Sequence, residues 1–225
     1  MINSIINQNP NIIIVGSGWA CKSFTNTIDK DKYNVKIISK SENFLYTPQL
    51  ANFSITNDVK KIETDMTNIS NIKFIKDTVK DVDFDKQILI TENDNIKYDY
   101  IIFTHGSQIN TFNIHGIKEN CLLLKTKKDA DEIHKQLSIL EPNSKVAVIG
   151  CGLTGSEIIG CLIDQKKFNI TAIDVLSGPL KMFNQKSIDF TLDLWKNNNI
   201  NMLFNSSVKR VEPSIIYYYF SINLK

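Results

Sequence analysis

Two glycine-rich segments are the parts of this 225-residue chain whose residue types and spacing are best suited to chemistry. The first is "VGSGWAC" at 15–21 and the second is "IGCGLTG" at 149–155, and each follows a short apolar run. The first glycine of such a turn bends the chain, the second lets the backbone approach a pyrophosphate, and the third lets the next helix pack on the strand. The phosphates then meet the N–H groups of the helix N-terminus. Two such turns predict two dinucleotides with electron transfer between them.

The two turns differ in how completely they match this pattern. Gly150, Gly152 and Gly155 supply all three glycines, whereas the first turn has Gly16 and Gly18 followed by Cys21. Because cysteine is small and often buried, we expect the close packing of the first helix to survive. The alternative for either turn is a tight strand-to-helix connection that binds no ligand.

The residue that ends the next strand indicates which nucleotide fits each turn. The segment "FNITAIDV" places Asp174 where a carboxylate accepts hydrogen bonds from both ribose hydroxyls. A 2′-phosphate would meet that carboxylate, and the chain's single arginine is Arg210, so NADH is favoured over NADPH. After the first turn, "YNVKIISK" ends in Ser39 and Lys40, which leaves the first nucleotide open.

Composition and charge argue against several other classes of protein. The net charge is +2 with no basic stripe, so nucleic acid is not an expected partner. No apolar run approaches the ~18 residues of a spanning helix, and "MINSIINQNP" has no signal-peptide core, so we expect an intracellular, cytoplasmic protein without a transmembrane segment. The cysteines lack the paired spacing that a disulfide reductase requires. The histidines have no ligand-like spacing with cysteines or carboxylates, so we expect no metal.

Hydrophobic patterns predict the order of the elements. Residues 11–40 predict a βαβ unit, 42–54 a loop centred on Pro48, and 58–67 a short helix. Alternating strands follow, with a hairpin at Glu92–Asn95 and a final apolar strand, "YDYIIFT". A helix is expected over Lys127–Leu140, and a second βαβ unit begins at Lys145. The predicted fold is α/β, with two Rossmann-like dinucleotide-binding units in tandem, the second incomplete.

Longer strings resemble a known family. Residues 15–50, "VGSGWACKSFTNTIDKDKYNVKIISKSENFLYTPQL", resemble the flavin-binding start of type II NADH dehydrogenases, the single-subunit, non-proton-pumping NADH:quinone oxidoreductases. The specific strings are G-S-G-W, I-I-S and F-x-x-T-P at this spacing. "KYDYIIFTHGSQINTFNIHG" and "VIGCGLTGSE" resemble later segments of the family. The resemblance runs from about residue 11 to about residue 212.

The resemblance implies a division into cofactor domains and a set of binding residues. It implies an FAD-binding domain over 1–112, an NADH-binding domain over 113–212 and an unrelated tail over 213–225. The residues implied for FAD are Gly16, Ser17, Gly18 and Trp19, with Ser39 and Lys40 at the adenosine end, Thr47 and Pro48 near the flavin, and Thr104 and Gly106 over its far side. Those implied for NADH are Gly150, Gly152, Leu153, Thr154, Gly155 and Asp174.

Glu157 is the candidate catalytic residue. We expect it on the first turn of the second helix, with its side chain facing the nicotinamide and the flavin. The alternative is an acid that the helix dipole favours at an N-terminus.

The implied reaction transfers a hydride from NADH to FAD and then electrons to a quinone. Family members continue with a returning flavin segment that bears a Gly-Asp pair and with helices that rest on the membrane, so we expect this chain to be C-terminally truncated. The closing segment "SIIYYYFSINLK" is expected to form one edge strand. The alternative function is a non-catalytic remnant that binds or senses nucleotides. Whether the chain forms a homo-oligomer stays open.

Overall fold

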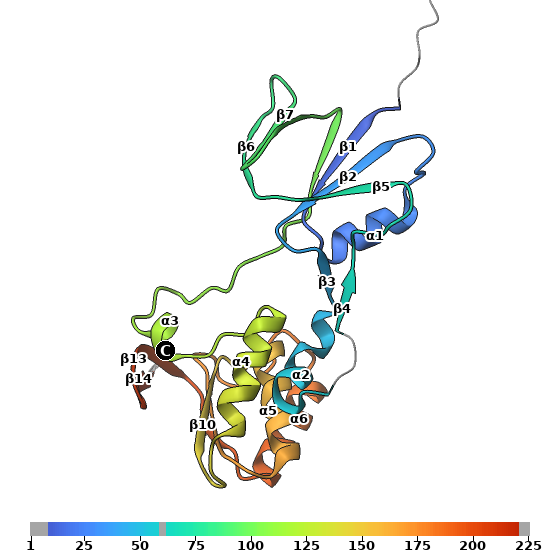
Figure 1. Ribbon diagram of the computed structural model, residues 1–225. Coiled ribbons are helices and arrows are strands. Elements are labelled where there is room, and N and C mark those ends of the chain that lie inside the picture. The colour runs from blue at the N-terminus through green and yellow to red at the C-terminus, as the bar shows by residue number, and fades with distance from the viewer. Residues whose placement is uncertain (1–8, 59–61, 221–225) are drawn as a thin grey trace, which may run out of the picture. The chain divides into compact units, whose positions relative to one another are not determined.

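The computed structural model describes residues 9–58 and 62–220 (Figure 1). The chain divides into two compact units. The first comprises residues 1–46 and 61–107, and the second comprises residues 47–60 and 108–225. A short segment of the first half of the chain therefore belongs to the second unit.

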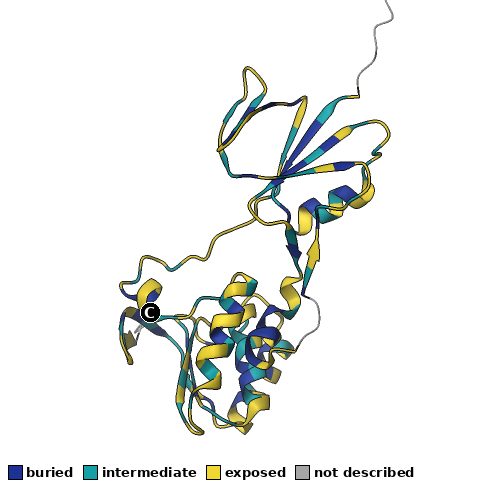
Figure 2. Ribbon diagram, viewed as in Figure 1, coloured by how far each residue is buried: buried dark blue, intermediate teal, exposed yellow. Residues whose placement is uncertain are grey.

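A parallel sheet forms the centre of the first unit. Its strands are β1 (Asn11–Val15), β2 (Asn34–Ser39), β5 (Ile72–Lys76) and β9 (Tyr100–Phe103), in the order β5-β2-β1-β9. Helix α1 (Trp19–Thr27) connects β1 to β2. Residues Ile12–Val15 of the inner strand β1 are all buried, as Figure 2 shows by the dark colour of this strand. The continuous apolar run of β1 is typical of a parallel strand that is covered on both faces.

Antiparallel strands complete the first unit. Strands β6 (Val79–Asp83), β7 (Ile88–Thr91) and β8 (Asn95–Lys97) form a meander, and β3 (Asn43–Leu45) pairs with β4 (Glu63–Asp65). The hairpin predicted at Glu92–Asn95 is confirmed, because this segment joins β7 to β8. Its turn is closed by the Thr91 N–H, which donates to the Asp94 carbonyl at 2.9 Å.

The second unit repeats the βαβ arrangement. Strands β10 (Lys145–Ile149), β11 (Asn169–Ile173) and β12 (Asn201–Leu203) form a parallel sheet in the order β10-β11-β12. Its helices are α3 (Ile117–Asn120), α4 (Lys127–Ser138), α5 (Leu153–Gln165) and α6 (Gln185–Asn197). Ile159, Leu162 and Trp195 are almost fully buried in the core between α5, α6 and the sheet. Strands β13 (Ser206–Glu212) and β14 (Ile215–Phe220) form an antiparallel pair.

Both predicted βαβ units and the predicted α/β fold are confirmed. Each pair β1–β2 and β10–β11 is parallel and is joined by a helix. The helix predicted over Lys127–Leu140 is confirmed as α4. Its first turn is fixed by a capping box, in which the Thr126 side chain accepts from the Asp129 N–H and the Asp129 carboxylate accepts from the Thr126 N–H.

The loop predicted over 42–54 is wrong. This segment contains β3, the 3₁₀ turn η1 (Thr47–Gln49) and the helix α2 (Leu50–Thr56). Pro48 lies in η1, immediately before α2, where its fixed φ and missing N–H are tolerated. Leu50, Phe53 and Ile55 are buried, and α2 packs against α4 and α5. Tertiary contacts within the second unit therefore hold this helix.

The short helix predicted over 58–67 is also wrong where the structure describes it. Residues 59–61 lie outside the described residues, and Glu63–Asp65 is strand β4, paired antiparallel with β3 from Asn43↔Asp65 to Leu45↔Glu63. The long-range pairing with β3 decides the conformation of this segment.

The compact units have other bounds than the cofactor domains expected over 1–112 and 113–212, since the second unit comprises residues 47–60 and 108–225. The assignment of one cofactor to each domain stays a prediction. In the expected tail, Ile215–Phe220 pairs with β13, while 221–225 lie outside the described residues.

Candidate functional site

The first glycine turn joins β1 to α1. Gly16 has a φ of +107°, which L side chains rarely adopt, and its N–H donates to the Ile38 carbonyl at 2.8 Å. Thr104 closes the other side of the turn. Its N–H donates to the Val15 carbonyl at 2.8 Å, and its hydroxyl donates to the Val15 and Gly16 carbonyls at 2.8 and 3.3 Å. The turn is therefore fixed between β2 and the end of β9.

Ser17 and Ser39 meet beside this turn. Their hydroxyl oxygens lie 3.1 Å apart, and the Ser17 hydroxyl also lies within hydrogen-bond distance of the Ser41 and Asn43 carbonyls. The Ser39 hydroxyl accepts from the Ser41 N–H at 3.2 Å. Both hydroxyls hold the segment after β2 against the turn. The backbone of the turn, rather than the Ser17 side chain, is therefore the part available to a ligand.

Trp19 begins α1 and belongs to an aromatic cluster. It is 48% exposed, its ring packs edge-on to Phe44 with centroids 4.9 Å apart, and it lies 5.4 Å from the Tyr46 ring. The ammonium of Lys22 lies 5.0 Å from the Phe44 centroid. Cys21, at the third position of the turn, is fully buried among the apolar residues of β1 and β2, so the expected close packing of α1 is confirmed.

The second glycine turn joins β10 to α5 and has the same backbone form. Gly150 has a φ of +92°, and its N–H donates to the Ile173 carbonyl at 2.8 Å. A Cβ on Gly155 would overlap the Gly150 carbonyl oxygen, so only glycine fits the third position. A Cβ on Gly152 would meet no atom within 4 Å. The second position therefore leaves the open space that a close ligand requires.

Asp174 follows β11 and lies beside this turn, as predicted. One carboxylate oxygen accepts from the Cys151 N–H at 2.6 Å, and the other accepts from the Leu176 N–H at 2.7 Å. These bonds tie the turn to the end of β11 and fix the carboxylate. An ionised carboxylate has about four lone-pair sites, so one site on each oxygen remains for a further donor.

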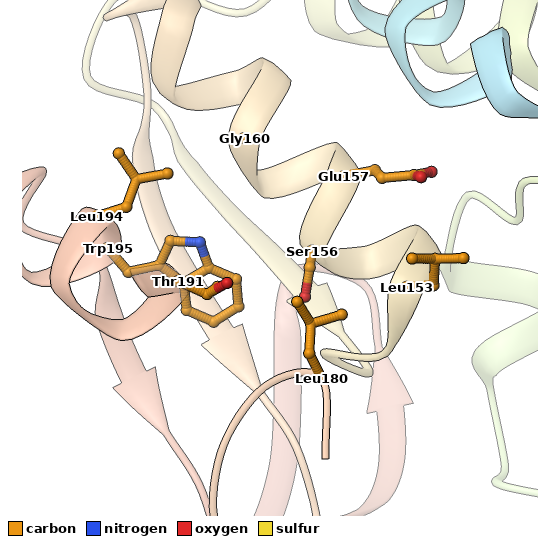
Figure 3. Close-up of a pocket in the computed structure, with 8 residues that line it drawn as sticks. All are labelled: Leu153, Ser156, Glu157, Gly160, Leu180, Thr191, Leu194 and Trp195. Carbon is orange, nitrogen blue, oxygen red and sulfur yellow. The ribbon is translucent and has the colours of Figure 1, made fainter. Parts of the chain in front are cut away.

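Glu157 lies on the second turn of α5, because that helix begins at Leu153. The expected position on the first turn is therefore wrong. The alternative, an acid that the helix dipole favours at the N-terminus, is wrong for the same reason, because the dipole acts mainly on residues of the first turn. Partial desolvation raises the pKa of the Glu157 carboxyl. In Figure 3 this side chain points away from α6.

A pocket of about 200 Å³ opens between α5 and α6 (Figure 3). It is lined by Leu153, Ser156, Glu157, Gly160, Leu180, Thr191, Leu194 and Trp195. The Trp195 side chain is fully buried, and its Nε1 has no hydrogen-bond partner in the described structure. Leu153, which lines the pocket, is the first residue of α5 and directly follows Gly152 of the second glycine turn.

The structure adds residues that the sequence analysis missed. The Leu180 N–H and the Ser156 hydroxyl both donate to the Cys151 carbonyl, at 2.9 and 3.1 Å, and so fix the second turn. Trp195 lies on the buried face of α6 with Ile188 and Thr191. The spacing of these three residues is a helical signal that could have identified that face.

The structure places the remaining predicted residues as follows. Thr154 is exposed on the first turn of α5, Lys40 is exposed after β2, and Gly106 has a φ of +72° in the segment after β9. Thr47 and Pro48 are exposed in η1 and belong to the second unit, whereas the first glycine turn belongs to the first.

The cysteines are poorly suited to thiolate chemistry. All four are free. Burial raises the pKa of the Cys21 thiol to about 11, and burial together with the Asp174 charge raises the pKa of Cys151 to about 12. Burial also raises the pKa values of Cys121 and Cys161. A thiolate nucleophile needs the opposite shift.

The described residues offer neither a metal-binding cluster nor a membrane-spanning helix. In residues 9–58 and 62–220, no group of His, Cys, Asp and Glu side chains is placed to hold a metal ion. No helix in this part of the chain combines the length and apolarity that a bilayer crossing requires.

The sequence of this chain is similar to those of known proteins. A family model described as pyridine nucleotide-disulphide oxidoreductase matches residues 10–216. The chain is 29% identical to a probable mitochondrial NADH-ubiquinone oxidoreductase of Schizosaccharomyces pombe, over 92% of this chain and 45% of that protein. It is 27% identical to external NADH-ubiquinone oxidoreductase 2 of Saccharomyces cerevisiae, over 91% of this chain and 45% of that protein. The chain thus spans about half the length of the curated relatives it matches.

Solved structures show the same relationship. NDH2 of Plasmodium falciparum in complex with NADH matches with a TM-score of 0.84 and 28% identity, covering 96% of this chain and 52% of that one. Sulfide:quinone oxidoreductase of Aquifex aeolicus matches in fold, with a TM-score of 0.81 at 22% identity, over 93% of this chain and 54% of that one. The resemblance to type II NADH dehydrogenases is confirmed by these relatives.

Proposed function

The chain belongs to the pyridine nucleotide-disulphide oxidoreductase family, and we propose that it carries the FAD and NADH sites of a flavin-dependent NADH dehydrogenase. FAD would lie on the first glycine turn and NADH on the second. The proposal is supported by the two turns, each with a positive-φ glycine at the end of a parallel strand and a helix N-terminus beyond it. It is also supported by the NADH-ubiquinone oxidoreductases among the relatives.

The residues present fit both nucleotides. The second glycine of each turn, Gly18 or Gly152, is open where a pyrophosphate would approach, since a Cβ on Gly18 would meet only the Thr104 carbonyl oxygen at 3.9 Å and one on Gly152 would meet nothing. The N–H groups of the first turns of α1 and α5 would then hold the two pyrophosphates. Trp19 extends one side of the first site, together with Tyr46.

In the proposed mechanism, residues of this chain orient the two nucleotides, and the cofactors supply the redox chemistry. FAD, when bound, supplies the acceptor for the hydride of NADH. Asp174, held by two backbone N–H groups, would accept hydrogen bonds from the adenosine ribose of NADH and orient that end of the nucleotide. Glu157, one turn into α5, is the residue that we propose to face the nicotinamide. A quinone is the proposed second acceptor.

The fixed Asp174 carboxylate beside the open Gly152 position is the observation that carries the proposal for NADH. Titration with NADH and NADPH tests it. We expect NADH to bind more tightly by roughly 1–3 kcal/mol, because a 2′-phosphate would lose charge-assisted hydrogen bonds and meet a carboxylate.

Asp174→Asn is the matched variant. It keeps an acceptor for one backbone N–H but removes the charge, so the preference for NADH should shrink. Equal affinities of the unmodified protein for NADH and NADPH would exclude a role for Asp174 in binding the ribose.

A nucleotide-binding protein without turnover is the second candidate. It is favoured by the second turn, where the open Gly152 position and the fixed Asp174 carboxylate offer a nucleotide site without requiring a flavin. Binding of NADH without a visible flavin band, even after incubation with FAD, would support this candidate. An intracellular site of action remains part of either proposal, and the names of both yeast relatives place those proteins in mitochondria.

A further inference from the structure

The Cys151 carbonyl, inside the second glycine turn, accepts hydrogen bonds from two different elements. The Ser156 hydroxyl on α5 donates to it at 3.1 Å, and the Leu180 N–H, from the segment after β11, donates to it at 2.9 Å. In Figure 3 the Ser156 hydroxyl points from α5 toward Leu180. A carbonyl oxygen has two lone pairs, so these two donors occupy both. The orientation of this carbonyl is therefore fixed by α5 and by the segment after β11.

This carbonyl determines where the next N–H points. The Cys151 C=O and the Gly152 N–H belong to one trans peptide group, and its planarity makes the two bonds point in opposite directions. The Gly152 N–H is therefore directed away from Ser156 and Leu180. Among residues 9–58 and 62–220 it has no hydrogen-bond acceptor, and a Cβ on Gly152 would meet no atom within 4 Å. It is thus a free donor at the position where a pyrophosphate would approach.

The two hydrogen bonds to the carbonyl also make the Gly152 N–H a stronger donor. Hydrogen bonds that share a peptide group polarise one another, so a carbonyl that accepts two bonds increases the partial positive charge on the N–H of the same group. This effect is larger where water is excluded, and here Cys151 is almost fully buried and Ser156 is partly buried.

The first glycine turn shows that a hydroxyl at this position is not needed for such a turn to fold. The Ser156 N–H donates to the Gly152 carbonyl at 2.9 Å. The Lys22 N–H donates to the Gly18 carbonyl at 3.0 Å, so Lys22 has the equivalent position in the first turn. The Lys22 side chain extends to Phe44 instead, with its ammonium 5.0 Å from the ring centroid. The Ser156 hydroxyl is therefore a feature of the second turn and not of the shared backbone form.

The second donor, Leu180, is fixed by its backbone. It has a φ of +51°, in the left-handed region that a bulky side chain rarely adopts. Its carbonyl accepts from the Phe183 N–H at 2.8 Å, and the preceding Pro179 is almost fully buried, so the surrounding contacts hold this conformation. Of the two donors, only the Ser156 hydroxyl can be removed by a substitution that leaves the backbone as it is.

We propose that Ser156 is a positioning residue of the nucleotide site, whose hydroxyl holds the Cys151–Gly152 peptide group so that the Gly152 N–H donates to the pyrophosphate. This inference rests on the proposed function, and it adds a residue that acts on the phosphates rather than on the ribose. Because the pyrophosphate is common to NADH and NADPH, Ser156 affects both nucleotides equally, whereas Asp174 distinguishes them.

Titration of Ser156→Ala with NADH and with NADPH tests the proposal. Loss of one hydrogen bond to the peptide group should weaken both nucleotides by the same factor, roughly threefold to tenfold, so their affinity ratio should stay that of the unmodified protein. Ser156→Thr keeps the hydroxyl and should restore both affinities, because its extra methyl group has room in the pocket that Ser156 lines.

Ser138→Ala is the matched control. It removes a hydroxyl that donates to the Lys135 carbonyl in α4 at 2.8 Å, and it should change neither affinity.

The Gly152 amide resonance provides a readout that a purely structural role of Ser156 would not change. Saturating NADH should move the Gly152 amide proton downfield in the unmodified protein, as expected for an N–H that donates to a phosphate oxygen. At the same saturation, the movement should be smaller in Ser156→Ala and complete in Ser156→Thr.

Unchanged affinities for both nucleotides in Ser156→Ala, or a Gly152 proton that NADH does not move, would overturn the proposal. So would a loss confined to NADH, which would mean that Ser156 acts through Asp174. An equal loss in Ser138→Ala, or a loss that Ser156→Thr does not restore, would also exclude the hydroxyl as the cause. A Ser156→Ala variant that does not fold would contradict the proposal as well, because the fold would then require the hydroxyl. Failure of the proposed function is distinguishable, since the unmodified protein would then bind neither nucleotide.

Discussion

At two glycines of the second turn, the same substitution to alanine should have different effects. Gly152→Ala adds a Cβ that meets no atom within 4 Å at an ordinary φ of −72°, so we expect normal folding. That Cβ lies on the side open to a pyrophosphate, so NADH affinity should fall by roughly tenfold or more, or about 1.4 kcal/mol. Gly155→Ala overlaps the Gly150 carbonyl and should destabilise the unit by about 1–3 kcal/mol.

Thermal unfolding and NADH titration of both variants distinguish these effects. Gly160→Ala is the matched control, because Gly160 lies within α5 and a Cβ there would meet no atom within 4 Å. It should stabilise α5 by roughly 0.5–1 kcal/mol without changing NADH affinity. Normal NADH binding by Gly152→Ala would contradict the proposed approach of the nucleotide to this turn.

The raised pKa of Glu157 predicts a dependence of stability on pH. Desolvation disfavours the carboxylate in the folded state, so between the ordinary and the raised pKa the folded chain binds more protons than the unfolded chain. Stability then falls as the pH rises through this window. Glu157→Gln lacks this loss, so it should unfold at a slightly higher temperature than the unmodified chain at pH 7 and at the same temperature below about pH 4.

Thermal unfolding followed by circular dichroism at both pH values measures this difference. A Glu157→Gln variant that is less stable than the unmodified chain at pH 7 would show that the carboxylate makes a stabilising contact in the folded state.

Thiol reactivity should follow burial and pKa. Cys121 and Cys161 are partly exposed, whereas Cys21 and Cys151 are buried with pKa values of about 11 and about 12. Iodoacetamide at pH 8 should therefore modify Cys121 and Cys161 first in the native protein, and all four after unfolding. Peptide mass spectrometry gives the order. Rapid modification of Cys151 would show that the second turn opens.

At the scale of elements, the capping box of α4 should be a measurable source of stability. Thr126→Ala removes the side-chain acceptor for the Asp129 N–H and should lower the free energy of unfolding by about 1 kcal/mol, whereas Thr126→Ser keeps it. Urea unfolding of both variants compares them. Since α4 packs against α2, equal stability would mean that this packing, rather than the cap, fixes the start of α4.

Short sequence motifs predicted those elements whose conformation depends on residues close in the sequence. The turns at Gly16 and Gly150 follow from glycines that allow a positive φ, and Asp174 follows from the length of one βαβ unit. Helix α2 does not follow from the local sequence, because Pro48 is typical of a loop and the helices that pack against the apolar face of α2 are the distant α4 and α5. Leu180 and Trp195 were missed as pocket residues because the packing of α5 and α6 brings them together.

At the scale of the molecule, we expect NADH binding to survive better than flavin binding. The residues expected to orient NADH are present around the second turn, while the chain spans about half the length of relatives such as the yeast enzymes. In the described residues, the Ser17 and Thr104 hydroxyls beside the first turn donate to backbone carbonyls and are therefore not free to donate to a flavin, and each such hydrogen bond contributes on the order of 1 kcal/mol. The purified protein should therefore be colourless, bind NADH, and reduce a soluble quinone slowly even with excess FAD.

Absorbance spectra and stopped-flow assays check this expectation. Stoichiometric, tightly bound FAD with rapid NADH:quinone turnover would contradict it and would show that the first turn and its neighbours hold the flavin without further segments.

Because α2 belongs to the second unit, it also affects how the chain folds while it is being synthesised. Helix α2 leaves the ribosome early, but the helices that cover Leu50, Phe53 and Ile55 follow much later, α5 about a hundred residues after it. At translation rates of roughly 5–20 residues per second, its apolar face waits several seconds for a partner. Nascent chains arrested before α5 emerges should therefore be cleaved by protease near α2, and chains arrested after it should be protected. Folding of this protein on the ribosome is consequently not a simple sequence of first unit and then second.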